Sequence, residues 1–179
     1  MLKLIIPSFE SFDEEKNEFI YSKGTTIQLE HSLISLSKWE SKWEKPFLSV
    51  ERKSIEESID YIRCMTLTQN INPIIYSGIT NENVSEVGSY IDAPMTATTI
   101  NKIDRKSNRE IITAEIIYYW MITFNVPFEC QKWHLNRLLT LINVCNIKNQ
   151  PPKKMGRAEI LSRNASLNSA RKQALGTRG

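Results

Sequence analysis

Two apolar segments in the second half of the chain repeat their large side chains at helical spacing. One face of residues 129–147 carries a row of aliphatic side chains, Leu135, Leu138, Leu139 and Ile142. Residues 109–124 are apolar almost all round from Ile116 onward. Apolar residues three and four apart line one side of an α-helix, and that side packs against a core. We therefore expect two helices packed as an antiparallel pair, with helix 109–124 buried at the centre.

The first thirty residues predict β-structure instead. Residues 2–6 are apolar and β-branched, and Pro7 ends the run. Segments 19–21 and 25–29 flank a Ser-Lys-Gly sequence, in which glycine can adopt the backbone angles of a tight turn. We expect a hairpin between these two segments, within a small antiparallel sheet over residues 1–30.

Two short helices should follow the sheet. The first carries its large apolar residues at helical spacing, namely Leu36, Trp39 and Trp43, and Pro46 limits its extent. Ser54 with Glu57 forms a capping box, in which each side chain bonds the backbone N–H of the other, at the start of the second. We expect these two helices to form a helical hairpin.

These patterns together predict an α+β, predominantly α-helical fold. A small N-terminal antiparallel sheet joins a helical body within residues 1–149, followed by a basic, flexible or partly helical C-terminal arm at 150–179. Residues 71–79 have strand composition, but Pro73 confines them to a sheet edge or a loop. The expected helices cover residues 32–45, 54–66, 83–91, 109–124 and 129–147.

The charge of the chain is unevenly distributed. Its 23 lysines and arginines exceed its 20 acids by three. From Lys148 onward, eight basic residues stand against Glu159 alone, a net +7, which leaves −4 for the rest. Such a segment cannot bury a core of its own, and residues 158–175 could become helical on a partner. We expect an arm that orders when it binds.

Cysteine usage and the N-terminal sequence predict a soluble, cytoplasmic protein. Cys64, Cys130 and Cys145 are odd in number and share no repeated spacing, which favours a reducing compartment. The first apolar run is short and acidic residues follow it, unlike a signal peptide. The longest apolar block, residues 116–122, is shorter than a membrane span.

The sequence contains no familiar catalytic motif. It has no glycine-rich phosphate loop, no nucleophile elbow and no paired-cysteine motif. Cys130 and His134 are four residues apart and could begin a metal site, but zinc needs three or four ligands. Buried structural roles for both residues are favoured. We expect no enzyme activity, no cofactor and no metal.

Candidate partner-binding residues fall in two places. Trp39 and Trp43 lie in a stretch otherwise rich in serine, lysine and glutamate, and are core residues if buried or a docking face if exposed. The core interpretation is favoured, and both residues remain candidates for partner binding. The basic arm supplies the other candidates, Lys153, Lys154, Arg157, Arg163, Arg171 and Lys172.

The partner of the arm stays open between three alternatives. Lysine and arginine neutralise phosphates, so nucleic acid is one alternative. The arm lacks aromatic residues for base stacking, however, which makes nucleic acid unlikely. An acidic or helical protein partner fits at least as well, and a solvated terminus without a partner is the third alternative.

Several stretches resemble one family of viral proteins. These are LEHSLISLSKWESKWEKPFL at 29–48, WMITFNVPFECQKWHLNRLLTLINVCNIKN at 120–149, PPKKM at 151–155 and LNSARKQALGTRG at 167–179. They resemble sequences of the tail assembly chaperones of tailed bacteriophages, over roughly half of the chain. Residues 1–18 and 71–108 carry no such resemblance.

The resemblance implies a non-enzymatic protein of the host cell cytoplasm. Such chaperones are thought to coat the long, largely helical tape measure protein and to recruit tail tube subunits, and they are usually absent from the finished virion. A homo-oligomer is compatible with this role. The alternative is a structural virion protein, either a head–tail connector or a tail component, whose arm embraces a neighbouring subunit. A nucleic-acid-binding protein acting through the arm is the weaker alternative.

Overall fold

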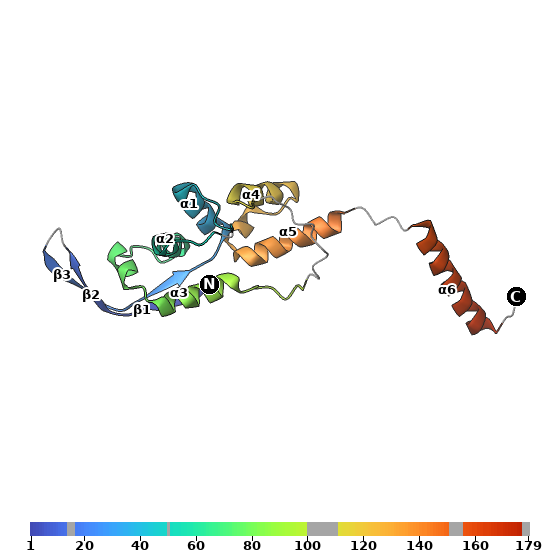
Figure 1. The fold of residues 1–179 in the computed structure, drawn as a ribbon, viewed down its shortest axis with the longest axis horizontal. Helices are drawn as coiled ribbons and strands as arrows, with labels where there is room; N and C mark the ends of the chain where they lie inside the picture. Colours follow the sequence, from blue (N-terminus) through green and yellow to red (C-terminus); the bar gives the residue numbers. More distant parts are fainter. Residues whose placement is uncertain (14–16, 50, 100–110, 151–155, 177–179) are drawn as a thin grey trace. The chain divides into compact units, whose positions relative to one another are not determined.

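The computed structural model describes residues 1–13, 17–49, 51–99, 111–150 and 156–176 (Figure 1). It divides into two units, residues 1–147 and 148–179. The fold is α+β and mainly helical, with a small antiparallel sheet at the N-terminus, as expected. The elements are β1 (Leu2–Ile6), β2 (Phe9–Asp13), β3 (Glu18–Ser22), β4 (Thr25–Leu29), α1 (Leu33–Trp43), α2 (Ile55–Met65), the 3₁₀ helix η1 (Pro73–Gly78), α3 (Asn81–Asp92), α4 (Ala114–Thr123), the 3₁₀ helix η2 (Phe128–Lys132), α5 (Leu135–Asn149) and α6 (Arg157–Leu175).

The four strands form one long antiparallel ribbon with an interruption. β1 pairs with β4, and β2 pairs with β3. Ile6 lies opposite Thr25 at the end of the first ladder, and Phe9 lies opposite Ser22 at the start of the second. Each strand advances three residues between these pairs, so both ladders share one register. The interruption includes Pro7, which has no N–H to donate to a ladder.

This register corrects the hairpin turn predicted at residues 22–24. The chain runs on from β3 into β4, and Gly24 does not have a positive φ. A Cβ atom at position 24 would lie 3.4 Å from both the Ile6 carbonyl oxygen and the Ser8 nitrogen. The small glycine thus lies close to the opposite strand at Pro7 rather than in a tight turn, and the hairpin predicted from the Ser-Lys-Gly sequence was wrong.

α1 and α2 form the expected helical hairpin, and each begins at a capping box. The hydroxyl of Ser32 accepts the N–H of Ser35 at the start of α1. At the start of α2, the Glu57 carboxylate accepts the Ser54 N–H at 2.8 Å, and the Ser54 hydroxyl accepts the Glu57 N–H at 3.1 Å. The capping box predicted for α2 is confirmed.

α4 and α5 do not form the central pair predicted from their periodicity. α4 packs mainly on α1, and α1 also contacts α2 and η2, so α1 is the central helix. Only Ala114, Ile117 and Met121 of α4 are buried, whereas Tyr119 and Ile122 are 65% and 61% exposed. The uniform apolarity of α4 could not show which of its faces a neighbour covers, and the prediction of a buried central helix was wrong.

Three elements differ from expectation in type or extent. Residues 71–79 contain η1 rather than an extended segment, because the Asn72 side chain caps it and Pro73 suits a first helical position. The helix expected from residue 129 starts at Leu135, after η2. α4 starts at Ala114, and residues 109 and 110 of the predicted helix lie outside the described residues.

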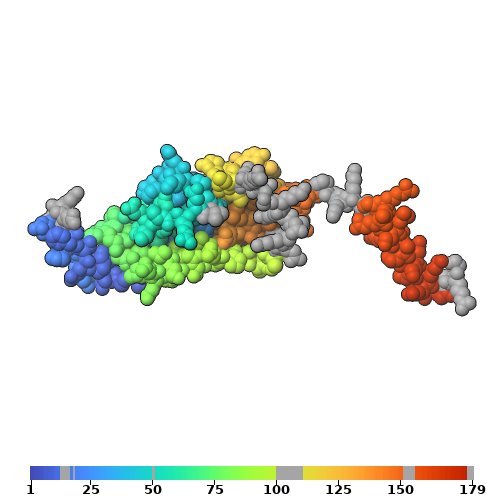
Figure 2. All heavy atoms as spheres, viewed as in Figure 1, coloured from blue at the N-terminus to red at the C-terminus, as the bar shows by residue number. Residues whose placement is uncertain are grey.

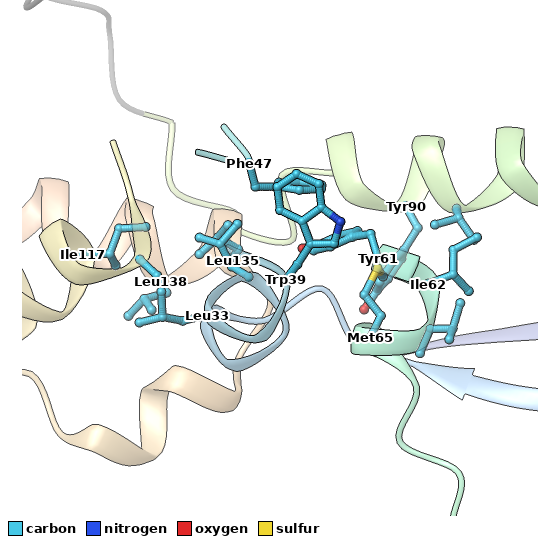
Figure 3. Close-up of a cluster of buried hydrophobic side chains, with 14 of the residues drawn as sticks. Leu33, Trp39, Phe47, Tyr61, Ile62, Met65, Tyr90, Ile117, Leu135 and Leu138 are labelled. Carbon is cyan, nitrogen blue, oxygen red and sulfur yellow. The ribbon is translucent and has the colours of Figure 1, made fainter. Parts of the chain in front are cut away.

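We call β1 and β4 the inner half of the ribbon, and β2 and β3 its outer half. The core lies where the inner half meets the helices of the first unit (Figure 3). Residues on the inward face of β1 and β4 are at most 1% exposed, namely Leu4, Ile6, Ile27 and Leu29. α3 lies against β1, where the Asn83 amide donates to the Ile5 carbonyl oxygen at 3.1 Å. Within the described residues, no helix is both long and apolar enough to cross a membrane.

The second unit contains α6, so the expected helix within the basic arm is present. Every described side chain of α6 is exposed. Its N-cap, Gly156, has no side chain to bond the first amides, and Gly176 ends the helix with a φ of 62°. Two candidate residues, Lys153 and Lys154, lie outside the described residues.

Candidate functional site: a groove beside Trp43

The two tryptophans of α1 lie in different environments. Trp39 is 1% exposed, and its indole N–H donates to the Glu57 carbonyl oxygen of α2 at 2.9 Å. Its ring packs against Phe47 and Tyr61, with ring centroids 5.1 and 6.5 Å away. Trp39 is therefore a core residue, and its assignment as a partner-binding residue is corrected. Trp43 stacks on Trp39 at 6.1 Å but is only half-buried.

Trp43 borders a groove of about 410 Å³ between α1, α2 and η1. Ile59 contributes a second apolar wall from α2, and Tyr76 lies on the η1 side. η1 is held beside α2 by Tyr76, which contacts Arg63 and Thr66, and the groove lies between these elements and the end of α1. A pocket with apolar walls and a few polar groups is the usual form of a binding site.

Asp60 holds the indole of Trp43 in place. Its Oδ2 accepts the Trp43 N–H at 3.0 Å, and its Oδ1 accepts from Lys42 Nζ at 2.5 Å. Burial acts to raise the pKa of Asp60, but the hydrogen bonds from Lys42 and Trp43 outweigh it, so the pKa lies below its ordinary value. Asp60 is thus ionised at neutral pH and keeps both partners oriented.

Charged groups of both signs surround the apolar walls of the groove. The Arg63 guanidinium lies 5.0 Å from the centre of the Tyr76 ring, a favourable cation–π distance. The Tyr76 hydroxyl donates to Thr66 Oγ1 at 3.0 Å, which fixes the ring. Lys42 and Glu56 complete the charged lining. Such a site can take an apolar side chain between the walls while paired charges bind polar groups beside it.

Glu40 of α1 is a buried carboxylate that joins three segments of the first unit. It is 8% exposed and accepts two backbone amides, Phe47 N–H at 2.8 Å and Ala114 N–H at 2.7 Å. Thr113, the N-cap residue of α4, makes no side-chain cap bond, so Glu40 takes over that role from another helix. Burial raises the pKa of Glu40, and the two amide bonds act against that shift.

The two histidines, about a hundred positions apart in sequence, meet in the core. Their ring centroids are 5.1 Å apart, and His31 Nδ1 shares a 2.6 Å hydrogen bond with the Tyr61 hydroxyl. His134 Nε2 donates to the Tyr90 carbonyl oxygen at 3.0 Å, and its Nδ1 accepts the Asn136 N–H at 3.3 Å. Both imidazoles are therefore tied into the backbone and side-chain framework of the first unit.

Burial lowers the pKa of His31 to about 3, and the nearby His134 adds to the shift. Burial likewise lowers the pKa of His134, although its bond to the Tyr90 carbonyl opposes the change. Both rings are neutral at pH 7. Sequence reasoning missed this pair, because nothing in the spacing of the two residues indicates that they touch.

The cysteine and histidine considered for metal binding do not lie on one helix. Cys130 lies in η2 and His134 precedes α5, whose first residue is Leu135. Among the described residues, no group of three or more cysteine, histidine or acidic side chains could hold a metal ion.

The candidate residues of the basic arm belong to the second unit, whereas the groove belongs to the first. Arg157, Arg163, Arg171 and Lys172 are in α6, which belongs to the second unit and exposes all of them. Trp43 is therefore the candidate that lies at the groove of the first unit, and the arm is a separate candidate surface.

Comparison with known proteins gave no match to a family model, to a curated protein or to a solved structure.

Proposed function

We propose that the chain is a non-enzymatic tail assembly chaperone of a tailed bacteriophage, which acts in the host cell cytoplasm. The observation that carries this proposal is the groove beside Trp43, with its anchored indole and charged rim. The resemblance of residues 29–48 and 120–149 to this family supports it, and the groove lies partly in the first of these stretches.

The client we propose for the groove is a helical segment of the tape measure protein. An amphipathic helix binds a groove by placing apolar anchors at one-turn intervals into it. Trp43 and Ile59 supply apolar walls, while Lys42, Glu56 and Arg63 offer both charge signs to the polar residues that flank such anchors. A long helical client repeats these features along its length, so many weak contacts would keep it soluble. Tail tube subunits would then replace the chaperone.

The experiment that tests this proposal co-expresses the chain with its tape measure protein and measures how much of the client stays soluble and co-purifies. Trp43→Ala should lower co-purification at least fivefold, since it removes the anchored wall. Ile122→Ala is the matched control, because Ile122 is 61% exposed on α4 and is not part of the groove. Equal binding by the two variants would refute the proposed client site.

A structural virion protein is the second candidate, and the exposure of all described side chains of α6 favours it. Such an arm could embrace a neighbouring subunit of a head–tail connector or tail. Quantitative mass spectrometry of purified virions and of infected-cell lysate separates the two candidates. A chaperone is abundant in lysate and absent from particles, whereas a structural protein is present in particles at a fixed ratio to tail proteins.

A further inference from the structure

The outer half of the ribbon exposes the face that its inner half buries. Strand residues alternate between two faces, and the shared register carries this alternation from β1–β4 into β2–β3. If the alternation is counted through the four residues between the two ladders, Leu4, Ile6 and Ile27 fall on the same face as Phe12, Phe19 and Tyr21. The first set is at most 1% exposed, whereas Phe12, Phe19 and Tyr21 are 47%, 77% and 62% exposed. In Figure 2 the strands β2 and β3, in blue, lie at one end of the first unit.

These exposed residues form a compact surface, which we call the tip face and define as Glu10, Phe12, Phe19 and Tyr21. Phe12 lies opposite Phe19, with ring centroids 5.0 Å apart, and Glu10 lies opposite Tyr21. Adjacent exposed aromatic rings on a soluble protein commonly mark a site of protein interaction. The tip face thus combines three aromatic rings with one exposed carboxylate.

The opposite face of the same strands fixes the position of the tip face. Phe9 packs its ring where a side chain on Gly78 of η1 would lie. Ser22, on that same opposite face, is buried. Because β2–β3 is held to the unit through this side, the aromatic rings of the tip face are kept outward and remain available to a partner.

α6 carries a face of complementary chemistry. At about 100° per residue, its four large aliphatic side chains fall within an arc of about 120°. These are Ile160, Leu161, Leu167 and Leu175, and each is between 44% and 75% exposed. Arg157, Arg171 and two asparagines, Asn164 and Asn168, fall within the same arc, while alanine and serine dominate the remainder of the helix. We call this arc the aliphatic–arginine face.

We propose that the tip face of one copy of the chain binds the aliphatic–arginine face of α6 from a second copy. Aromatic and aliphatic side chains would then cover each other, and an arginine would pair with Glu10 or lie on an aromatic ring. The wider segments around the two faces also carry opposite net charges. Residues 10–18 contain five acids and one lysine, whereas residues 148–179 carry a net +7.

The contact also accounts for two features that are unfavourable for a single copy. A helix with no buried side chain has little tertiary packing to stabilise it, and a partner surface supplies that packing. Exposed aromatic rings likewise lose contact with water. The two faces differ, so each copy offers both, and the contact can repeat head to tail to give rings or open chains. This inference stands whether or not the proposed chaperone function is correct.

Sedimentation velocity of the full chain over a wide range of concentrations tests the contact. The wild type should sediment faster as concentration rises. Phe19→Ser should raise the concentration needed for association at least tenfold, because it removes the most exposed ring of the tip face. Ile5→Ser is the matched control, since Ile5 is 68% exposed on the other face of the same ribbon and should leave association unchanged. Leu167→Ser and its control Ala165→Ser make the same comparison on α6.

Exchanging the charges of Glu10 and Arg171 tests whether the two faces contact each other. Glu10→Arg and Arg171→Glu should each weaken association when studied alone. When the two variants are mixed, association should recover, because one copy then offers an arginine and the other a glutamate at the contact. A monomer at every concentration, equal effects of Phe19→Ser and Ile5→Ser, or no recovery on mixing would each overturn the proposal. A concentration-independent change of sedimentation in Phe19→Ser would overturn it too, since it would place the contact within one copy.

Discussion

Lowering the pH from 7.5 to 5 should destabilise the first unit through His31. Its pKa in the folded chain is about 3, whereas a histidine in an unfolded chain has a pKa of about 6.5. The unfolded chain therefore binds the proton first as the pH falls. The stabilising contribution of neutral His31 is complete above about pH 7.5, begins to be lost near pH 6.5, and continues to fall until about pH 3.

The size of the effect follows from these two values. For a single group titrating at about 3 and about 6.5, the free energy of unfolding falls by about 2 kcal/mol at pH 5 and by about 3 kcal/mol at pH 4. His134 acts in the same direction, because burial also lowers its pKa. The carboxyl of Asp60, whose pKa is lowered, loses its contribution only at more acidic pH. Glu40, whose pKa burial raises, acts against the histidines near pH 5.

Urea unfolding followed by tryptophan fluorescence measures the free energy of unfolding at each pH. Trp39 lies within the core beside Tyr61, the hydrogen-bond partner of His31, so its emission should report the loss of this region. In His31→Gln, most of the expected loss of about 2 kcal/mol in the free energy of unfolding between pH 7.5 and 5 should disappear. The same variant should be less stable than the wild type at pH 7.5. A wild type equally stable at both pH values would refute the reasoning, and so would a slope that His31→Gln leaves unchanged.

Three other substitutions test the framework by the same urea assay. Trp39→Ala should cost about 3–5 kcal/mol, as large cavities in a core do, and a loss below 1 kcal/mol would place the indole outside the core. Glu40→Gln should cost about 1–3 kcal/mol, because an amide offers one acceptor oxygen to the two backbone amides that the carboxylate now binds; wild-type stability would show that α4 does not depend on this cap. Gly78→Ala should cost about 1–3 kcal/mol by overpacking, since Phe9 occupies the space of the new methyl group. Gly88→Ala is its control, because nothing lies within 4 Å of a Cβ atom there, and equal losses in both would contradict the packing.

Features that depend on a few neighbouring residues could be predicted from the sequence. The capping box of Ser54 and Glu57 is local chemistry, and α2 begins where it indicates. The helical spacing of Trp39 and Trp43 identified α1 for the same reason. The broad class of the fold followed from such segments, because each contributes its own periodicity.

Features that depend on distant partners could not be predicted. Gly24 suggested a turn, but it lies between β3 and β4, close to Pro7 on the opposite side of the ribbon. Glu40 lies in a stretch rich in serine, lysine and glutamate, which gives no sign that its carboxylate accepts the amide of Ala114. The apolar surface of α4 suggested burial, yet Tyr119 is 65% exposed.

The sequence predicted part of the candidate site. The unusual tryptophans directed attention to α1, but which of them borders a groove depends on Asp60 of α2 and on η1. Residues 71–79 had strand composition, so the η1 side of the groove could not be foreseen. The two histidines meet where the start of α5 docks against the segment just before α1, a contact that no short window of sequence contains.

That docking sets an order for the synthesis of the protein. The N–H of Leu135 donates to the His31 carbonyl oxygen at 2.7 Å, and Ser32 forms an isolated bridge with His134. The junction between the ribbon and α1 is thus completed by residues made about a hundred positions later. A nascent chain that stops before His134 leaves this junction open, however well its hairpins have formed. Such distant contacts require a large loop to close, which costs chain entropy and slows folding. The junction can therefore close only after His134 and Leu135 have been made, so the ribbon and α1 must wait for a segment about a hundred positions further along the chain.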